Sequence, residues 1–222
     1  MRPELVVFDL DGTLVDSAAD IRNALNLALA ADGLPGIALE AVRLMIGRGP
    51  EVLLQRALAH LGESADAGRV AHLTAAFRQH YTEQGHGQSR LLPGAADCLT
   101  ALAQQGIRAA VCSNKPTPNC VQVLEELGIA HHFESIQGSG DGLPLKPDPA
   151  PLKAIIDRLG VPAGATLYVG DSETDIATAR GAAVPVVIVK GGYSAAPPGA
   201  MAADWTIDSL AEVIALCEPG AR

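Results

Sequence analysis

Short apolar runs alternate along this chain with longer segments in which apolar residues recur at helical spacing. Four apolar runs predict strands, at residues 5–8, 107–112, 166–169 and 184–189, and residues 133–136 predict a weaker one. Helical spacing predicts helices at residues 95–105, 120–127, 151–159 and 175–180. Because strands that alternate with helices form parallel sheets with crossover helices, we expect an α/β fold.

Residues 16–90 interrupt this alternation with Ala- and Leu-rich helical segments and no convincing strand. The predicted helices are residues 18–31, 39–45, 50–61 and 69–84, with glycine-bearing turns between them. We therefore expect an all-helical domain at residues 16–90, inserted into a discontinuous core that is formed by residues 1–15 and 91–222. Near the end of the chain, the stretch Ala195-Ala196-Pro197-Pro198-Gly199 predicts an exposed loop.

Composition and charge narrow the range of partners. The 222 residues include 16 Lys and Arg against 25 Asp and Glu, which gives a formal charge of -9. This negative charge argues against a nucleic-acid partner, and three Phe, three Tyr and one Trp supply little surface for stacking on bases. No apolar run approaches the ~18 residues of a membrane-spanning helix, so we expect no membrane partner.

The cysteines and histidines indicate neither disulfides nor a metal cage. Cys98, Cys112, Cys120 and Cys217 show no CxxC spacing, and no basic segment precedes a long apolar stretch at the start of the sequence. We therefore expect buried, reduced thiols and a cytoplasmic location. The six histidines form no cluster with cysteines or carboxylates, and we expect each to be exposed or hydrogen-bonded.

Polar side chains gather where the predicted strands end. The first strand is followed by Asp9 and Asp11, the second by Ser113, and the third strong strand by Asp171, while a loop before that strand carries Lys146. Because open parallel sheets bind ligands at the carboxyl ends of their strands, we expect these groups to share one site. Carboxylates, a hydroxyl and an ammonium are the groups that phosphoryl transfer requires.

The two acids after the first strand have different candidate roles. Asp9 is the candidate nucleophile, since a carboxylate that attacks phosphorus forms an aspartyl-phosphate. Asp11 is the candidate general acid and base. Mg2+ prefers oxygen ligands and keeps several waters, so Asp9, Asp171 and the backbone carbonyl of Asp11 would suffice as protein ligands. The alternative for these acids is an ordinary role in turns and helix caps.

Phosphate oxygens need cationic or hydrogen-bonding partners. Ser113 and Lys146 are the candidates for binding the transferring phosphoryl group. Thr13, Asn114 and Lys115 are further candidate substrate contacts. A helix cap is the alternative role for Ser113, and a solvated surface charge is the alternative for each lysine.

Four motifs taken together resemble those of the haloacid dehalogenase superfamily of phosphohydrolases. They are residues 9–17, 113–115, 146–149 and 170–175, which stand in the family's order from the first strand to the last third of the chain. The resemblance implies a Rossmann-like core with a helical cap inserted after the first motif. It also implies Mg2+ bound by Asp9, Asp11 and Asp171, with Asp175 supporting the site from close by.

The residues discriminate among the chemistries of this superfamily. The dehalogenases lack the second acid of the opening motif, so Asp11 favours phosphate chemistry. Phosphonate-cleaving relatives use a cap lysine as a Schiff base, but residues 16–89 contain no lysine. Receiver domains combine similar residues, yet they are shorter and lack a helical insertion. A non-catalytic phosphate-binding or scaffold protein is the remaining rival, which a phosphatase assay distinguishes.

Among the phosphatases, residues 46–50, 112–116 and 145–149 are similar to bacterial phosphoglycolate phosphatases. Arg48 lies between two glycines in the expected cap, where it would reach a substrate carboxylate when the cap closes. The resemblance implies hydrolysis of a small phosphorylated metabolite, 2-phosphoglycolate. Sugar phosphates such as N-acetylmuramic acid 6-phosphate, and the substrates of hexose-phosphate mutases, remain alternatives. The sequence leaves both a monomer and a homodimer open.

Overall fold

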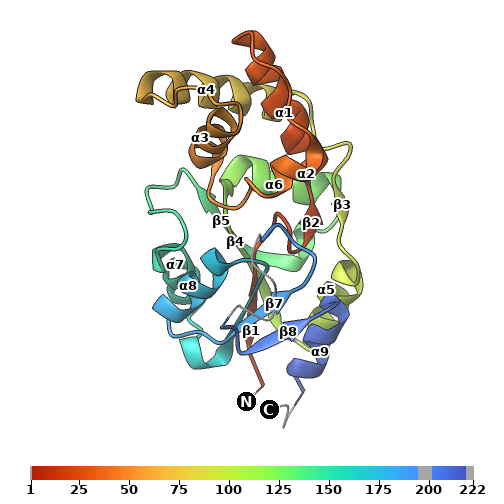
Figure 1. Cartoon of the computed structure of the whole chain (residues 1–222). Coiled ribbons are helices and arrows are strands. Elements are labelled where there is room, and N and C mark those ends of the chain that lie inside the picture. Colours follow the sequence, from red (N-terminus) through yellow and green to blue (C-terminus); the bar gives the residue numbers. More distant parts are fainter. Residues whose placement is uncertain (1, 195–201, 219–222) are drawn as a thin grey trace.

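The computed structural model describes residues 2–194 and 202–218, and it has two parts (Figure 1). A sheet with flanking helices forms one part, and four helices lie beyond one end of that sheet. The loop predicted at residues 195–199 lies outside the described residues.

The sheet has six parallel strands in the order β5-β4-β1-β6-β7-β8. Their bounds are β1 (Leu5–Phe8), β4 (Arg108–Pro116), β5 (Phe133–Ser139), β6 (Thr166–Gly170), β7 (Val186–Val189) and β8 (Trp205–Ile207). This sheet confirms the predicted α/β fold class with a Rossmann-like arrangement. The strand β8 was not predicted, because three residues are too few to show a strand periodicity.

Register aligns the carboxyl ends of the three central strands. Phe8, the last residue of β1, pairs with Val111 of β4 on one side and with Val169 of β6 on the other. The residues that follow these three positions therefore emerge at one edge of the sheet. Asp9 is the first of them.

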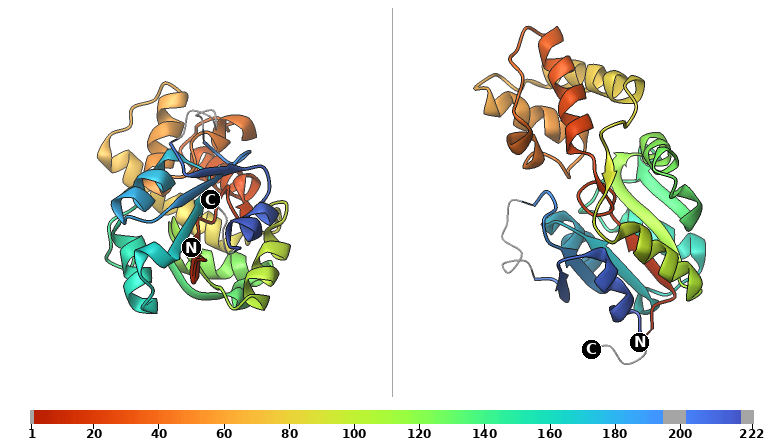
Figure 2. Two further views of the ribbon diagram at one scale, coloured as in Figure 1. Left: turned by 90° about the horizontal axis from the view of Figure 1, so that it is seen from below. Right: turned by 90° about the vertical axis from the view of Figure 1, so that its right-hand side faces the viewer.

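Helices cover both faces of the sheet (Figure 2). The helices α5 (Ala95–Gln104), α6 (Thr117–Glu126) and α9 (Val213–Leu216) share a hydrophobic cluster with Val6 and Phe8. The helices α7 (Ala150–Leu159) and α8 (Glu173–Gly181) share another with Leu5 and Val7. Short 3-10 turns complete the core at η1 (Ala130–His132), η2 (Ala163–Ala165) and η4 (Leu210–Glu212). Burial on both faces explains why β1 is apolar throughout.

The four remaining helices form a cap with a hydrophobic core of its own. They are α1 (Ala18–Ala31), α2 (Leu39–Arg43), α3 (Pro50–His60) and α4 (Ala67–Glu83), and each lies within two residues of a predicted helix at both ends. Pro50 begins α3, and the Asp66 carboxylate caps α4 by accepting from the Arg69 N–H. Buried leucines such as Leu25, Leu54 and Leu73 pack between these helices.

Two chain crossings join the cap to the core. There β2 (Val15–Asp16) pairs in antiparallel fashion with β3 (Arg90–Leu91). The Asp20 carboxylate of α1 also accepts hydrogen bonds from the Ser89 hydroxyl at 2.7 Å and the Gln88 N–H at 3.2 Å. The expectation of no strand within residues 16–90 is therefore wrong for Asp16 and Arg90, since a two-residue ladder carries no readable periodicity.

The cysteines agree with the prediction, and one histidine does not. All four thiols are free and buried, and burial raises the pKa of Cys98 to about 12 and that of Cys217 to about 11. His86 is buried, yet neither ring nitrogen has a hydrogen-bond partner among the described residues. Burial lowers the pKa of His86, and its ring packs on Tyr81 with 4.8 Å between centroids.

The described part of the chain contains no helix long and apolar enough to span a membrane.

The cap core predicts a contrast between two leucines of α1. Leu25 is fully buried in the cap cluster, whereas Leu27 is 49% exposed. Leu25→Ala should lower the free energy of unfolding by about 2–5 kcal/mol, because it removes buried methyl groups and leaves a cavity. Leu27→Ala, the matched control, should change it by less than about 0.5 kcal/mol. Urea unfolding of both variants measures the difference, and equal losses would contradict this packing.

Candidate active site

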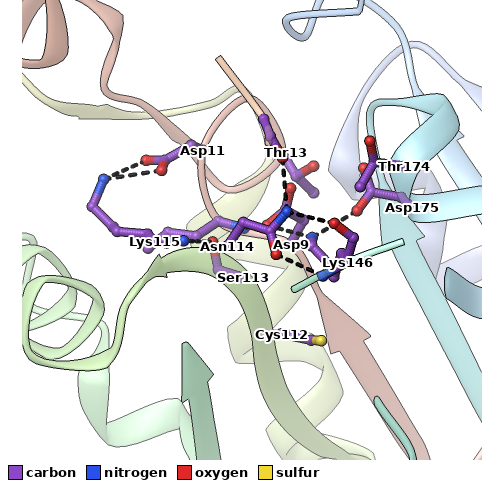
Figure 3. Close-up of polar contacts among 12 residues, drawn as sticks. Asp9, Asp11, Thr13, Cys112, Ser113, Asn114, Lys115, Lys146, Thr174 and Asp175 are labelled. Carbon is purple, nitrogen blue, oxygen red and sulfur yellow. Dashed lines mark hydrogen bonds and ion pairs between the residues drawn. The ribbon is translucent and has the colours of Figure 1, made fainter. Parts of the chain in front are cut away.

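The predicted site residues converge at the carboxyl edge of the sheet. Asp9 follows β1, Ser113 lies in the last part of β4, and Asp171 follows β6. Lys146 reaches the same place from the loop between β5 and α7 (Figure 3). Four separate segments therefore supply one cluster, as the strand-end argument predicts.

Lys146 lies between two carboxylates. Its Nζ is 2.9 Å from Asp9 Oδ1 and 2.8 Å from Asp175 Oδ1, and its side chain is only 1% exposed. Burial disfavours its charge, but the carboxylates of Asp175 and Asp9 outweigh that effect and raise its pKa above the ordinary lysine value. Burial raises the pKa of Asp9 to about 6, although Lys146 acts to lower it. The ammonium is therefore a permanent positive charge beside the candidate nucleophile.

Asp175 supports this lysine, and both of its carboxylate oxygens accept hydrogen bonds. One carboxylate oxygen accepts from Lys146 Nζ and from the Tyr168 hydroxyl at 3.1 Å. The other accepts from the N–H groups of Asp171 at 3.2 Å and Ser172 at 3.1 Å, and from the Ser172 hydroxyl at 2.7 Å. These bonds cap the start of α8 and fix the backbone at Asp171. Asp175 therefore orients both Lys146 and Asp171.

Two glycines enclose the carboxylate of Asp171. A Cβ atom added at Gly12, where φ is +87°, would lie 2.6 Å from Asp171 Oδ2. One added at Gly192 would lie 2.7 Å from Asp171 Cγ and nearer still to its Cβ and Oδ2. The Tyr193 N–H donates to Asp171 Oδ2 at 2.6 Å, and the Thr13 hydroxyl lies 3.4 Å from Oδ1. Only a chain with glycine at both positions leaves room for this carboxylate.

The acidic cluster fits a divalent cation. Asp9, Asp171 and Asp175 each offer a carboxylate oxygen within 4.8 Å of the others, and all three residues are buried. Burial, together with the charges of Asp175 and Asp9, raises the pKa of Asp171 well above its usual value. One ammonium balances only one of three buried carboxylates. A cation held by oxygen ligands relieves the remaining repulsion, which supports a metal site at Asp9 and Asp171.

Asp11 faces a different partner. Lys115 Nζ binds both of its carboxylate oxygens, at 2.7 and 3.0 Å, and the Ser17 hydroxyl donates to Oδ1 at 2.5 Å. Lys115 is buried, and its Nζ lies 4.7 Å from the centre of the Tyr81 ring. Burial disfavours the charge of Lys115, but Asp11 outweighs that effect and raises the pKa above the usual lysine value. The predicted alternative of an exposed Lys115 is therefore wrong, because the acid and the ring compensate for burial.

Ser113 and Asn114 line the cavity that contains Asp9. Ser113 is 5% exposed and lines the cavity that also contains Asp9 and Asp11, and its hydroxyl accepts the Lys115 N–H at 3.3 Å. The Asn114 side chain donates to the carbonyls of Gly47 at 3.1 Å and Lys146 at 2.9 Å, and it accepts from the Lys146 N–H at 2.8 Å. Asn114 therefore positions the Lys146 loop and touches the cap.

Arg48 does not line the cavity that contains Asp9, although Asp11, Ile46 and Gly47 line both that cavity and the one beside Arg48. It is exposed and lines a cavity of about 480 Å³ together with Arg56, Asp171, Thr174 and Tyr193. A smaller cavity of about 60 Å³ contains Asp9, Asp11 and Ser113, and the cap contributes other side chains to it. A role for Arg48 in binding the substrate carboxylate stays a prediction.

Comparison with known proteins gives one consistent result. The family model of haloacid dehalogenase-like hydrolases matches residues 6–189. A phosphoglycolate phosphatase of Rhodospirillum rubrum is 41% identical over 98% of this chain and 93% of the relative, and one of Cereibacter sphaeroides is 44% identical over 86% and 87%. A predicted phosphoglycolate phosphatase from Haemophilus somnus has a similar structure, with a TM-score of 0.91, 33% identity and coverage of 98% and 99%.

This chain belongs to the haloacid dehalogenase-like hydrolases. It is a phosphoric monoester hydrolase similar to the phosphoglycolate phosphatases, as the motifs predicted. Phosphatases of this family act on small phosphorylated substrates and generally use a divalent metal, for which the cluster of Asp9 and Asp171 is suited.

Sequence reasoning missed Tyr193 in this hydrolase. Its hydroxyl accepts from the N–H groups of Ser17 at 2.8 Å and Ala18 at 3.0 Å, at the start of α1, and donates to Asp16 at 2.7 Å. Its backbone N–H donates to the Asp171 carboxylate. Tyr193 therefore contacts both the proposed metal site and the residues at which the chain enters the cap. A signal was available, because residues 191–193 follow a predicted strand and strand ends carry ligands.

A methyl group added at Gly192 should severely reduce activity, because the Asp171 side chain lies against this glycine. Gly192→Ala should reduce kcat/KM at least about 100-fold, because displacement of Asp171 by a fraction of an ångström misaligns the site. Gly164→Ala is the matched control, since a Cβ there meets nothing within 4 Å. Steady-state kinetics of both variants, with circular dichroism to verify folding, measure the effect. Full activity of Gly192→Ala would refute this packing of Asp171.

Proposed function

We propose that this enzyme hydrolyses 2-phosphoglycolate to glycolate and phosphate, with Mg2+ and through an aspartyl-phosphate at Asp9. The observation that supports this chemistry is the position of Asp9 directly after β1. There it lies 2.9 Å from Lys146 and forms a cluster with Asp171. The names of the relatives, at 41% and 44% identity, support the choice of substrate.

Asp9 is the nucleophile in this proposal. The Leu10 N–H donates to Asp9 Oδ1 at 2.7 Å, and Lys146 lies on the same oxygen. These bonds hold Oδ1 and leave Oδ2 to attack phosphorus. Lys146 and Ser113 bind phosphoryl oxygens as the P–O bond to the leaving alcohol breaks, and Thr13 and Asn114 support the site around them.

Asp11 transfers protons in both halves of the reaction. It donates a proton to the departing glycolate oxygen, and it accepts one from the water that then cleaves the aspartyl-phosphate. Since Lys115 and Ser17 hold its oxygens in this structure, Asp11 must give up part of these contacts to reach the leaving oxygen. Lys115 then becomes available to orient the substrate.

The proposed metal ligands are Asp9, Asp171 and the backbone carbonyl of Asp11, with Asp175 behind them. Mg2+ bound there supplies positive charge beside the phosphate oxygens and lowers the repulsion between substrate and carboxylates. The protein contributes the geometry, since Gly12, Gly192 and the Tyr193 N–H fix the Asp171 carboxylate.

The cavity at Asp9 supports a small substrate. Its volume of about 60 Å³ is lined on the cap side by apolar residues such as Ile21, Leu53 and Phe77. A second candidate is a sugar phosphate, because CbbY from Rhodobacter sphaeroides, bound to xylulose-(1,5)bisphosphate, has a similar structure at 25% identity and a TM-score of 0.80, covering 95% and 96%. The larger cavity beside Arg48 and Arg56 would suit such a ligand.

The covalent route predicts that Asp9→Asn abolishes turnover for every phosphomonoester. The amide keeps the size of the side chain but is a very poor nucleophile, so kcat should fall at least about 1,000-fold. Mass spectrometry of rapidly quenched wild-type enzyme should show phosphate on the peptide that contains Asp9. Turnover by Asp9→Asn at near the wild-type rate would eliminate the nucleophile assignment.

A substrate panel tests the proposed function. The enzyme should show its highest kcat/KM on 2-phosphoglycolate, ahead of hexose phosphates, N-acetylmuramic acid 6-phosphate and nucleotides. EDTA should remove this activity and added Mg2+ should restore it, since the carboxylates then lack their counter-ion. A higher kcat/KM on a sugar phosphate would favour the second candidate, and EDTA-resistant activity would refute the metal.

A further inference from the structure

We propose that Arg78 and Tyr81 of the cap helix α4 bind the carboxylate of the substrate and thereby select 2-phosphoglycolate. This inference rests on the proposed function and names the residues that would give it specificity. The geometry that suggests it is the cavity of about 60 Å³, which runs from Asp9, Asp11 and Ser113 to these two side chains.

Helix α4 presents one face to this cavity. Phe77, Arg78 and Tyr81 all line it, and positions three and four apart share a face of a helix. Ile21, Ile46 and Leu53 form apolar walls beside them. A substrate whose phosphorus lies at Asp9 therefore extends its other end toward Arg78 and Tyr81. Tyr81 is buried beside these apolar walls, where a charge-assisted hydrogen bond is strong.

The guanidinium of Arg78 is free to bind an anion. Within the described residues, no hydrogen bond or ion pair joins Arg78 to another side chain, although Arg78 also lines an adjacent hollow together with Glu51 and Asp141. Arg78 is exposed at the mouth of the cavity. A guanidinium matches the two oxygens of a carboxylate, so Arg78 can bind both at once.

Tyr81 supplies an independent indication of a ligand. It is only 4% exposed, and its hydroxyl has no hydrogen-bond partner in the described structure. A buried hydroxyl without a partner costs free energy, which a bound acceptor would recover. Burial raises the pKa of Tyr81 although the nearby Lys115 ammonium acts to lower it, so the hydroxyl stays neutral and can donate to an anion. Phe77 stacks on its ring with 5.6 Å between centroids and fixes its position.

Arg48 is the competing residue for this role. It lines the larger cavity on the side of Asp171 and Thr174, whereas Ser113 and Asn114 line the smaller one with Arg78. Asp11 lines both cavities and Asp171 lines that of Arg48, but the predicted phosphate ligands Ser113 and Asn114 line only the cavity of Arg78. A substrate bound by Ser113 and Asn114 therefore has α4 as its neighbour.

Two substrates that differ only at the distal group test the inference. One is 2-phosphoglycolate, and the other is 2-hydroxyethyl phosphate, in which a hydroxymethyl group replaces the carboxylate. Arg78→Ala should lower kcat/KM for 2-phosphoglycolate about 100-fold, because the carboxylate loses its charged partner. The same variant should change kcat/KM for 2-hydroxyethyl phosphate less than about 3-fold, since no anion is lost.

Three further variants sharpen the comparison. Tyr81→Phe keeps the ring over Lys115 and should cost about 10-fold on 2-phosphoglycolate alone. Arg78→Lys should recover part of the selectivity, since it keeps the charge and loses the second hydrogen bond. Arg22→Ala is the matched control, because Arg22 lies in α1 and bonds only Asn23 among the described residues. Its kinetics on both substrates should equal those of wild type.

The outcomes separate this inference from the proposed function. If wild type prefers 2-phosphoglycolate but Arg78→Ala loses activity equally on both substrates, the subsite is refuted and the function stands. A selective loss in Arg48→Ala with none in Arg78→Ala would also refute it. If wild type shows no preference for 2-phosphoglycolate over 2-hydroxyethyl phosphate, both the proposed substrate and the subsite fall.

Discussion

The ammonium of Lys146 offsets part of the buried negative charge on which this site depends. It lies within 2.9 Å of Asp9 and 2.8 Å of Asp175, and Asp171 adds a third carboxylate to the same cluster. Removing Lys146 would leave the buried carboxylates of Asp9 and Asp175 without their positively charged partner, which is far more costly than losing a surface ion pair. The excess of negative charge that remains can be balanced by a divalent cation.

The second constraint is steric and joins the core to the cap. Gly12 and Gly192 leave space for Asp171, and Tyr193 holds it with its N–H while its hydroxyl caps the start of α1. Arg43 of the cap reaches Asp16 at 2.7 Å beside the same ring. The position of the cap is therefore coupled to the carboxylate that would bind the metal. In the proposed function, the core carries out the reaction and the cap recognises the leaving group.

Much of the fold could be predicted because apolar periodicity records burial directly. The strand at residues 5–8 is apolar throughout since helices cover both faces of the sheet, and the cap helices show the one-sided pattern of a small separate core. β8 and the β2–β3 pair were missed, because two or three residues form a ladder through partners that are distant in sequence. Hydrogen bonds to such partners leave no local pattern.

The sequence by itself determined the candidate reacting groups of the site, since Asp9, Asp11, Lys146 and Asp171 each stand at a strand end or in a motif of recognisable order. Only the tertiary structure decided how they are partnered: Asp11 with Lys115, Asp175 with Lys146, and Asp171 with Gly192 and Tyr193. It also placed Arg78, rather than Arg48, in the cavity of Asp9. The physical reason is that side-chain types follow from local sequence, whereas distances between segments a hundred residues apart depend on how helices and strands pack.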